Sequence, residues 1–228
     1  MDFLSGETIL VDKPYGWTSF DVVNKIRWNL KQKLKIKKIK VGHAGTLDPL
    51  ATGLLVICTG KHTKKIAQLT GAPKSYTGTI LLGKTTPSFD LETAYDSDQD
   101  TSHIKSEQIE KVRAEFIGVQ QQTPPLYSAK QIDGKRAYDY ARAGKNIELI
   151  SNEIEITSFE INANRFPEID FSIHCSKGTY IRSVAADFGK KLGCGATLTT
   201  LRRTASGTLS LKDAKSVEEW LQMIQALE

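Results

Sequence analysis

Residues 42–60 read GHAGTLDPLATGLLVICTG. The apolar run at 54–58 is typical of a buried strand, and the glycine-rich stretch before it is typical of a loop. This loop carries Asp48, the one acidic residue between Val22 and Phe89, a segment that holds thirteen Lys and Arg residues. By residue type alone the loop is an ordinary Asp-Pro turn. Its electrostatic setting favours a second interpretation, in which Asp48 stays ionised among cations and is available as a nucleophile.

Strand and helix signals lie on both sides of this loop, without the strict alternation of a parallel α/β fold. The pattern predicts strands at residues 8–11, 36–41, 54–58, 76–82, 154–161 and 171–175, and a hairpin at 198–211. It predicts helices from Thr18 or Ser19 onward, at 64–69, from Ser106 to about 116, at 180–192, and after Ser216. Mixed elements in this order indicate an α+β fold.

Two stretches interrupt the pattern. Residues 84–104 are polar and acidic, which predicts an exposed loop. Residues 120–144 contain Pro124-Pro125, a hairpin turn at Asp133-Gly134 and a short helix that ends at Gly144, which together predict an inserted unit. No long linker or internal repeat divides the chain. We therefore expect one domain over residues 1–228, with an insertion at about 120–145.

The positive charge is concentrated early in the chain. The net charge is +5 over 228 residues, and the cations are densest in RWNLKQKLKIKKIK at residues 27–40. Such a block is commonly a solvated face, but clustered lysines also bind nucleic acid by releasing counterions from its phosphates. The lysines alternate with Leu and Ile at strand spacing, which argues against a membrane-surface helix. A solvated face and a phosphate-binding surface both fit this block.

Composition excludes several classes of protein. Apolar residues make up 39% and charged residues 25%, which excludes collagen-like, coiled-coil and disordered chains. No apolar run approaches the roughly 20 residues that a bilayer span needs, and the N-terminus does not resemble a signal peptide. The histidines show no metal-ligand spacing, and the three cysteines are far apart: Cys58, Cys175 and Cys194. We therefore expect no disulfide, no metal, no membrane partner and a cytoplasmic location.

The loop at 42–60 closely resembles the catalytic motif of the bacterial tRNA pseudouridine-55 synthases, the TruB family. Further blocks resemble other motifs of that family, in the family's order and over nearly the whole chain. They are ILVDKPYGWTSFDVV at 9–23, KSYTGTILLGKTTPSFD at 74–90, QQTPPLYSAKQIDGKRAYDYARAG at 121–144, CSKGTYIRSVAADFG at 175–189 and LRRTASG at 201–207. The resemblance implies a pseudouridine-synthase-like α+β fold. Its sheet is mixed and mostly antiparallel, helices flank it, and the insertion forms an RNA-gripping thumb.

The resemblance also implies roles for three catalytic residues. Asp48 matches the catalytic aspartate. Tyr76 matches the tyrosine that packs on the target base, and its hydroxyl is a suitable group to help remove the proton from C5 of the rotated base. Arg182 matches the arginine that pairs with the catalytic carboxylate, and a guanidinium fork suits that task. Judged by residue type alone, Tyr76 would be an ordinary strand aromatic and Arg182 a surface residue.

Further residues match positions that bind the RNA. The resemblance implies that Tyr180 and Leu201 line the uridine pocket and that His43 reaches into the RNA loop as the target nucleotide is extruded. We expect much of the charge that grips the RNA to come from two groups of cations. These are residues 31–40 and the insertion residues Lys130, Lys135 and Arg136.

The implied reaction isomerises the uridine at position 55, in the T arm of tRNA, to pseudouridine. Bonds are exchanged without net oxidation or hydrolysis, so no cofactor is needed, and the nucleotide must flip out of its loop to react. The sequence does not decide whether Asp48 adds to uracil C6 or acts at ribose C1′. Two alternatives stay open, namely a guide-RNA-dependent synthase subunit and a tRNA-folding chaperone. We expect a monomer with no obligate protein partner and without the PUA-type module that many relatives carry.

Overall fold

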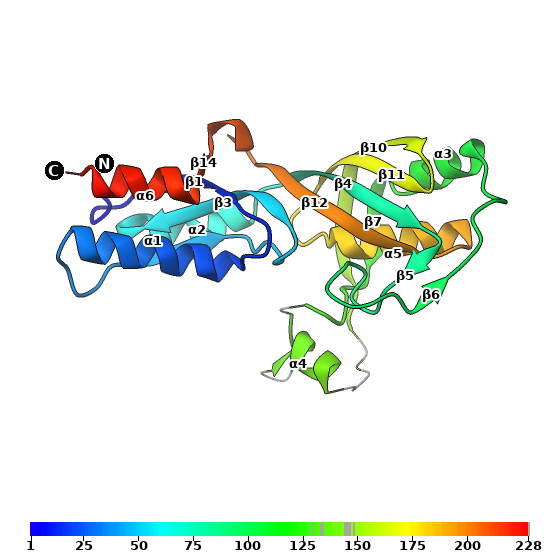
Figure 1. Ribbon diagram of the computed structural model, residues 1–228, viewed down its shortest axis with the longest axis horizontal. Coiled ribbons are helices and arrows are strands. Elements are labelled where there is room, and N and C mark those ends of the chain that lie inside the picture. The colour runs from blue at the N-terminus through cyan, green and yellow to red at the C-terminus, as the bar shows by residue number, and fades with distance from the viewer. Residues whose placement is uncertain (129, 133–134, 144–146, 148, 228) are drawn as a thin grey trace. The chain divides into compact units, whose positions relative to one another are not determined.

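The computed structural model describes residues 1–128, 130–132, 135–143, 147 and 149–227 (Figure 1). The chain forms two compact units. Unit 1 consists of Met1–Tyr76 and Leu201–Glu228, and unit 2 consists of Thr77–Thr200. Strands β4 (Lys74–Leu82) and β12 (Ala196–Ser206) carry the chain from one unit to the other. That both units make up one catalytic domain remains a prediction.

Unit 1 is a sheet with helices. Its elements are β1 (Thr8–Lys13), α1 (Ser19–Lys33), β2 (Val41–Ala44), β3 (Thr52–Thr59), the 3₁₀ helix η1 (Gly60–Lys65), α2 (Ile66–Thr70), β13 (Leu209–Ser210), the 3₁₀ helix η2 (Leu211–Asp213), β14 (Lys215–Ser216) and α6 (Val217–Gln225). β3 is central, because β1 and β2 pair with it antiparallel and the end of β12 pairs with it parallel. β14 pairs parallel with β1, and β13 pairs antiparallel with β12.

The core of unit 1 lies between α1, α6 and the strands β1 and β3 (Figure 1). Helix α1 begins at its N-cap Thr18, which forms a capping box with Asp21. The helix then buries Val22, Ile26 and Leu30 at the spacing of one helix face. Helix α6 begins at a second capping box, between Ser216 and Glu219. Both helices are therefore positioned by the residues that the sequence pattern indicates.

Unit 2 contains the longer antiparallel strands. Its elements are β5 (Lys84–Thr85), β6 (Ser97–Asp98), α3 (Ser106–Ala114), β7 (Gly118–Gln122), β8 (Gln131–Ile132), β9 (Lys135–Arg136), α4 (Ala137–Arg142), β10 (Asn152–Arg165), β11 (Glu168–Cys175) and α5 (Ile181–Leu192). The strand order is β4-β11-β10-β7. Edge-to-face and tilted ring contacts join α5 and the residues just after α3 to β10 and β11; the rings are those of Phe116, Phe159, Phe171 and Phe188. Helix α5 ends at Gly193, whose φ of 78° suits a left-handed cap.

The α+β class and the mostly antiparallel sheet are confirmed, and most predicted elements are present. The strand predicted at 36–41 is wrong: Lys35 takes a left-handed φ of 52° after α1, and the strand begins only at Val41. The exposed loop predicted at 84–104 is also wrong in part, because it contains β5 and β6 and buries Thr86, Ser88 and Asp90. In the insertion, β8 and β9 form the predicted hairpin, whereas Asp133, Gly134 and Gly144 lie outside the described residues.

Within the described part of the chain, no helix is both long enough and apolar enough to cross a bilayer. The three cysteines are buried, and none of them is in a disulfide.

Candidate active site

The Asp48 loop, residues 45–51, joins β2 to β3 in unit 1 and is held at several points. The backbone N–H of Ala51 donates to the Asp48 carbonyl at 3.1 Å, which closes a turn directly after the carboxylate. Ser19, the first residue of α1, makes two hydrogen bonds with Leu47: its hydroxyl donates to the Leu47 carbonyl at 3.0 Å and accepts from the Leu47 N–H at 2.8 Å. The start of α1 therefore fixes the residue that precedes Asp48.

A buried lysine holds the other side of the loop. Lys13, the last residue of β1, has no exposed surface, and its ammonium donates to the carbonyls of Pro14, Trp17 and Pro49 at 3.0, 2.5 and 3.2 Å. Burial lowers the pKa of Lys13 to about 8, although the negative charge of Asp48 opposes this shift. Lys13 therefore ties the turn at residues 14–17 to the residue that follows Asp48.

A buried arginine holds the beginning of the loop. Arg203 in β12 is 1% exposed and donates to three carbonyls, from Nε to Leu54 at 2.7 Å, from Nη1 to Thr46 at 3.3 Å and from Nη2 to Gly45 at 3.0 Å. Gly53 pairs with Arg203 and has a φ of 98°. A Cβ there would lie 2.3 Å from the Arg203 carbonyl oxygen, so only glycine allows the two strands to approach this closely.

Unit 1 also holds three further predicted site residues. His43 lies in β2, and burial, together with the nearby charge of Arg203, lowers its pKa. A neutral imidazole is thus favoured at this position. Tyr76 in β4 is 8% exposed, and Leu201 in β12 is half-buried, with its carbonyl accepting from Thr52 at 3.4 Å.

Unit 2 holds Arg182, in the first turn of α5, and gives it a partner that sequence reasoning missed. The Arg182 guanidinium is almost fully buried, with Nε 3.5 Å from an oxygen of Asp90 and Nη1 donating to the Ser88 carbonyl at 3.2 Å. Asp90 is also buried, at 5% exposure. A buried carboxylate that faces a buried guanidinium holds it in one orientation. Asp90 ends the block 74–90, but the acidic residues that follow it predict a solvated loop.

Tyr180, the N-cap residue of α5, is held by a second residue that the sequence did not reveal. The side-chain amide of Gln122 clamps its backbone, with Nε2 donating to the Tyr180 carbonyl at 3.0 Å and Oε1 accepting from the Tyr180 N–H at 2.8 Å. One turn into the helix, the Ser183 hydroxyl donates to the Thr123 carbonyl at 2.9 Å. The start of α5, which carries Tyr180 and Arg182, is therefore fixed to the end of β7.

The insertion cations are described only in part. The Lys130 ammonium donates to the Ile150 carbonyl at 2.6 Å and to Oδ1 of Asn152 at 3.3 Å, so it ties the insertion to the start of β10. Lys135 and Arg136 lie in β9, and their side chains fall outside the described part of the structure.

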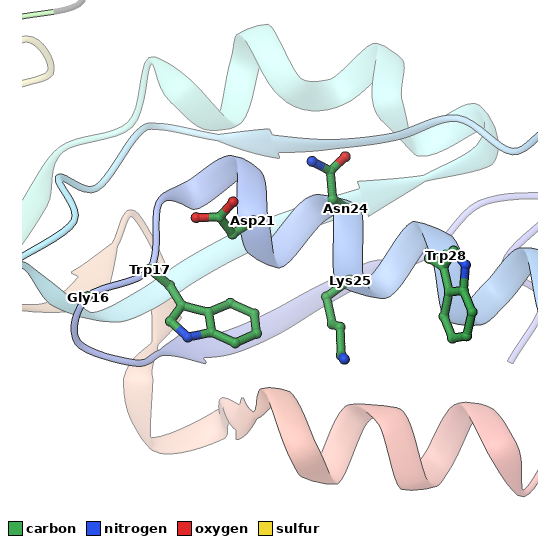
Figure 2. A pocket seen from close by; sticks show the side chains of 6 residues that line it. All are labelled: Gly16, Trp17, Asp21, Asn24, Lys25 and Trp28. Atoms are coloured by element: carbon green, nitrogen blue, oxygen red, sulfur yellow. The ribbon is translucent and has the colours of Figure 1, made fainter.

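A hollow of about 530 Å³ lies along α1 (Figure 2). Asp21, Asn24, Lys25 and Trp28 line it from one face of the helix, together with Gly16 and Trp17 from the preceding turn. The Asp21 carboxylate accepts from the Thr18 N–H and hydroxyl at 2.9 and 2.6 Å, and these bonds lower its pKa. Asp21 therefore serves as part of the helix cap, and we assign it no acid–base role.

Among the described residues there is no group of three or more His, Cys, Asp or Glu side chains that could hold a metal ion.

Matches to known protein families cover nearly the whole chain. Residues 31–181 match the N-terminal domain of the TruB family pseudouridylate synthases, and residues 182–227 match the tRNA pseudouridylate synthase B C-terminal domain. The chain is 50% identical to tRNA pseudouridine synthase B of Flavobacterium johnsoniae, over 98% of each chain. It is 52% identical to the same enzyme of Phocaeicola vulgatus, over 97% of this chain and 95% of that one.

Solved structures give the same fold. A chain in a crystal structure of a Cbf5–Nop10–Gar1 complex is 28% identical and superposes with a TM-score of 0.67, over 91% of this chain. A chain in a structure of an H/ACA RNP bound to a substrate RNA superposes with a TM-score of 0.68 at 25% identity, over 96% of this chain. The present chain spans about half the length of these two, at 50% and 53%.

Proposed function

The chain belongs to the TruB family of pseudouridylate synthases, and we propose that it converts the uridine at position 55, in the T arm of tRNA, to pseudouridine. It is an isomerase that acts on tRNA. The position, the site residues, a monomeric state and independence from protein partners are part of the proposal. Because the substrate is tRNA, we place the reaction in the cytoplasm.

The observation that carries the proposal is the fixation of the Asp48 loop. Lys13, Ser19 and Arg203 are all buried, and each hydrogen-bonds a loop residue within three positions of Asp48. Buried polar groups are costly unless they are satisfied, and here their bonds hold one short turn. A carboxylate held in one place before substrate arrives is what a nucleophile or an electrostatic catalyst requires.

In the proposed mechanism, the target nucleotide leaves its stack and Asp48 acts on it as a nucleophile, at uracil C6 or ribose C1′. The N1–C1′ bond breaks, the uracil turns, and a C5–C1′ bond forms. C5 then loses its proton and N1 gains one, so the atoms balance without an added reagent. Tyr76 stacks on the base, a contact worth about 1–3 kcal/mol, and its hydroxyl assists the loss of the C5 proton.

The remaining site residues position the substrate and the carboxylate. Arg182 orients Asp48 in the proposal, and the buried ion pair with Asp90 supports this role because it restricts the guanidinium. Tyr180 and Leu201 line the uridine pocket, and the Gln122 clamp fixes Tyr180. His43 enters the RNA loop, and its lowered pKa favours a neutral ring that both donates and accepts hydrogen bonds. Lys130 and Arg136 lie on the insertion that grips the RNA.

Release of tritium from a tRNA transcript labelled at C5 of uridine tests the proposal, because C5 loses its hydrogen only if the base is isomerised. We expect the protein alone to release one tritium per tRNA, and none from a transcript with cytidine at position 55. Asp48→Asn, which preserves the side-chain shape, should bind the transcript and release none.

Two results would replace this proposal with an alternative. If the protein isomerised an isolated T-arm hairpin only in the presence of a guide RNA or a partner protein, the result would indicate a guide-dependent synthase. Faster tRNA folding with no tritium release would indicate a chaperone that does not catalyse isomerisation.

A further inference from the structure

A second hollow in unit 1 is lined mainly by lysines. It encloses about 300 Å³ between three segments: the N-terminal stretch, the residues before β2, and η1. Four of the eight lining residues are lysines, and none is acidic; the eight are Leu4, Lys38, Ile39, Lys40, Gly60, Lys61, Thr63 and Lys64. We call this feature the lysine hollow. It combines the basic stretch noted in the sequence with a second group of cations, Lys61 and Lys64 in η1.

Backbone contacts build the lysine hollow, so its shape does not depend on mobile side chains alone. The Gly60 N–H donates to the Lys40 carbonyl at 2.9 Å, and the Lys61 N–H donates to the Ser5 carbonyl at 3.1 Å. A Cβ on Gly60 would lie 2.3 Å from the Leu4 carbonyl oxygen, so the segments approach as closely as glycine permits. These contacts hold the lysines of both segments around one cavity.

The positive charge of the lysine hollow is not neutralised within the described part of the protein. None of its four lysines forms an ion pair with a described residue. The acids of the adjacent N-terminal stretch are engaged in that stretch itself. Asp2 accepts from the N–H groups of Leu4 and Ser5, and Glu7 accepts from the N–H of Asp2 at 2.8 Å. An anion in the hollow would relieve the repulsion between the four ammonium groups.

The lysine hollow lies at the opposite end of β3 from the Asp48 loop. β3 begins at Thr52, close after Asp48, and ends at Thr59, next to Gly60. Its eight residues span about 25 Å at the usual rise of a strand. A distance of this size covers several base pairs of a duplex, so an anion in the hollow would be several nucleotides away from the reacting uridine.

We propose that the lysine hollow binds backbone phosphates of the tRNA at a distance from the nucleotide that reacts, an inference that rests on the proposed function. Lysines are point charges that suit phosphates without fixing a sequence. The hollow is open and its lysines are exposed, so counterion release from a chain of phosphates provides the affinity, and a single free phosphate binds weakly. The site anchors the tRNA and does not touch the reacting base.

Two double variants test the proposal, Lys38→Ala with Lys40→Ala and Lys61→Ala with Lys64→Ala, each in the full chain. The control is Lys212→Ala with Lys215→Ala, which removes the same charge from exposed positions of unit 1 outside the hollow. The measurement is the dissociation constant for full-length tRNA over a series of salt concentrations. We expect each hollow variant to bind tRNA at least about fivefold more weakly than the parent protein. The dependence of log Kd on log salt concentration should become less steep by about one phosphate contact. The affinity of the control should stay within about twofold of the parent value.

Combining the two hollow variants should cost less than the product of their separate losses, because both segments hold the same phosphates. A T-arm hairpin shortened to the loop and its nearest base pairs should bind the hollow variants and the parent protein equally. The proposal would be overturned if the hollow variants kept the parent's tRNA affinity and salt dependence. It would also be overturned if the control variant lost as much affinity for tRNA as the hollow variants, or if the hollow variants lost as much affinity for the short hairpin as for full-length tRNA.

An NMR titration of the Gly60 and Lys61 amides distinguishes the source of the phosphate. We expect tRNA to shift these signals at concentrations where inorganic phosphate does not. If inorganic phosphate shifted them at lower concentrations than tRNA, the hollow would be assigned to a free anion and the proposal would be overturned. Tritium release by the parent protein tests the proposed function separately. A lack of release would reject the isomerisation, while the dissociation constants would still decide whether the hollow binds tRNA.

Discussion

The guanidinium of Arg203 donates a 3.0 Å hydrogen bond to the carbonyl of Gly45, three residues before Asp48. With its bonds to Thr46 and Leu54, it satisfies backbone acceptors at the start of the Asp48 loop and within β3. One buried cation therefore connects the strand that returns from unit 2 to the loop that carries the proposed nucleophile. The fold and the site depend on the same residue.

We predict that Arg203→Met lowers both stability and turnover. The substitution leaves three carbonyls without their donor, which should cost about 3 kcal/mol or more in the free energy of unfolding. Tritium release should fall more than tRNA affinity, because the loss affects the geometry of the Asp48 loop. Urea unfolding and the release assay, at a temperature where the variant is folded, provide the two measurements.

Arg202→Met is the matched control for stability. Arg202 is the neighbouring residue in β12, is half-exposed, and pairs with Asp12 at 2.6 Å. Exposed pairs contribute little, so this variant should lose about 1 kcal/mol or less. Equal losses of stability in the two variants would contradict a special role for Arg203.

We predict that Gly53→Ala is much more damaging than Gly16→Ala. Both glycines have positive φ values, 98° and 81°, so both substitutions incur the cost of about 1 kcal/mol for a left-handed residue. A Cβ at Gly53 would also collide with the backbone of Arg203, whereas one at Gly16 meets nothing within 4 Å. Unfolding in urea should show an additional loss of about 2 kcal/mol or more for Gly53→Ala. Similar losses at both positions would show that the strands can separate without cost.

The lowered pKa of Lys13 predicts that the stability of the protein depends on pH. Its pKa is about 8 in the folded protein and 10.5 in its ordinary state. Between these values the unfolded chain binds a proton that the folded chain has released, so the free energy of unfolding should rise with pH. Below pH 8 the full penalty of burying the charge, roughly 3 kcal/mol, is present.

The difference between the parent protein and Lys13→Met measures this effect, because other groups titrate equally in both. Urea unfolding from pH 8 to pH 10.5 should show a rise in the parent that Lys13→Met lacks and that the exposed-site control Lys212→Met retains. A rise of the same size in Lys13→Met would assign the pH dependence to another group.

The sequence predicted elements whose signals are local, and it failed where a long-range contact decides the structure. The capping boxes at Thr18 and Ser216 depend on residues three positions away, so a linear pattern reveals them. Lys13 and Arg203 are also fully buried, but a charged residue in a sequence indicates an exposed surface unless its partners are known. Those partners are backbone carbonyls up to 158 residues away, which carry no sequence signal.

Long-range contacts also explain which residues of the site the sequence did not reveal. The resemblance to a family supplied Asp48, Tyr76 and Arg182 as candidates, and the geometry added the residues that hold the Asp48 loop and Arg182. Asp90 was missed because the acidic stretch around it is mostly exposed, and only its pairing with Arg182 distinguishes it from its neighbours.

Asp90→Asn should therefore reduce turnover more than it reduces tRNA binding. Asparagine keeps the shape of the side chain but removes the charge that faces Arg182 at 3.5 Å. Arg182 keeps its hydrogen bond to the Ser88 carbonyl but loses the negative charge of Asp90, which should lower the free energy of unfolding by about 1–3 kcal/mol. If Arg182 orients Asp48, as proposed, the loss of its fixed orientation should lower the rate of tritium release at saturating tRNA by at least tenfold.

Asp170→Asn controls for the general effect of losing a carboxylate in unit 2. Asp170 pairs with Arg165 at 2.6 Å, but both side chains are substantially exposed, at 42% and 57%. Its loss should change neither the release rate nor the dissociation constant by more than about twofold. If Asp90→Asn lowered tRNA affinity as strongly as it lowered the rate, the pair of Asp90 and Arg182 would have to be assigned to RNA binding, and its proposed role in positioning the catalytic carboxylate would be rejected.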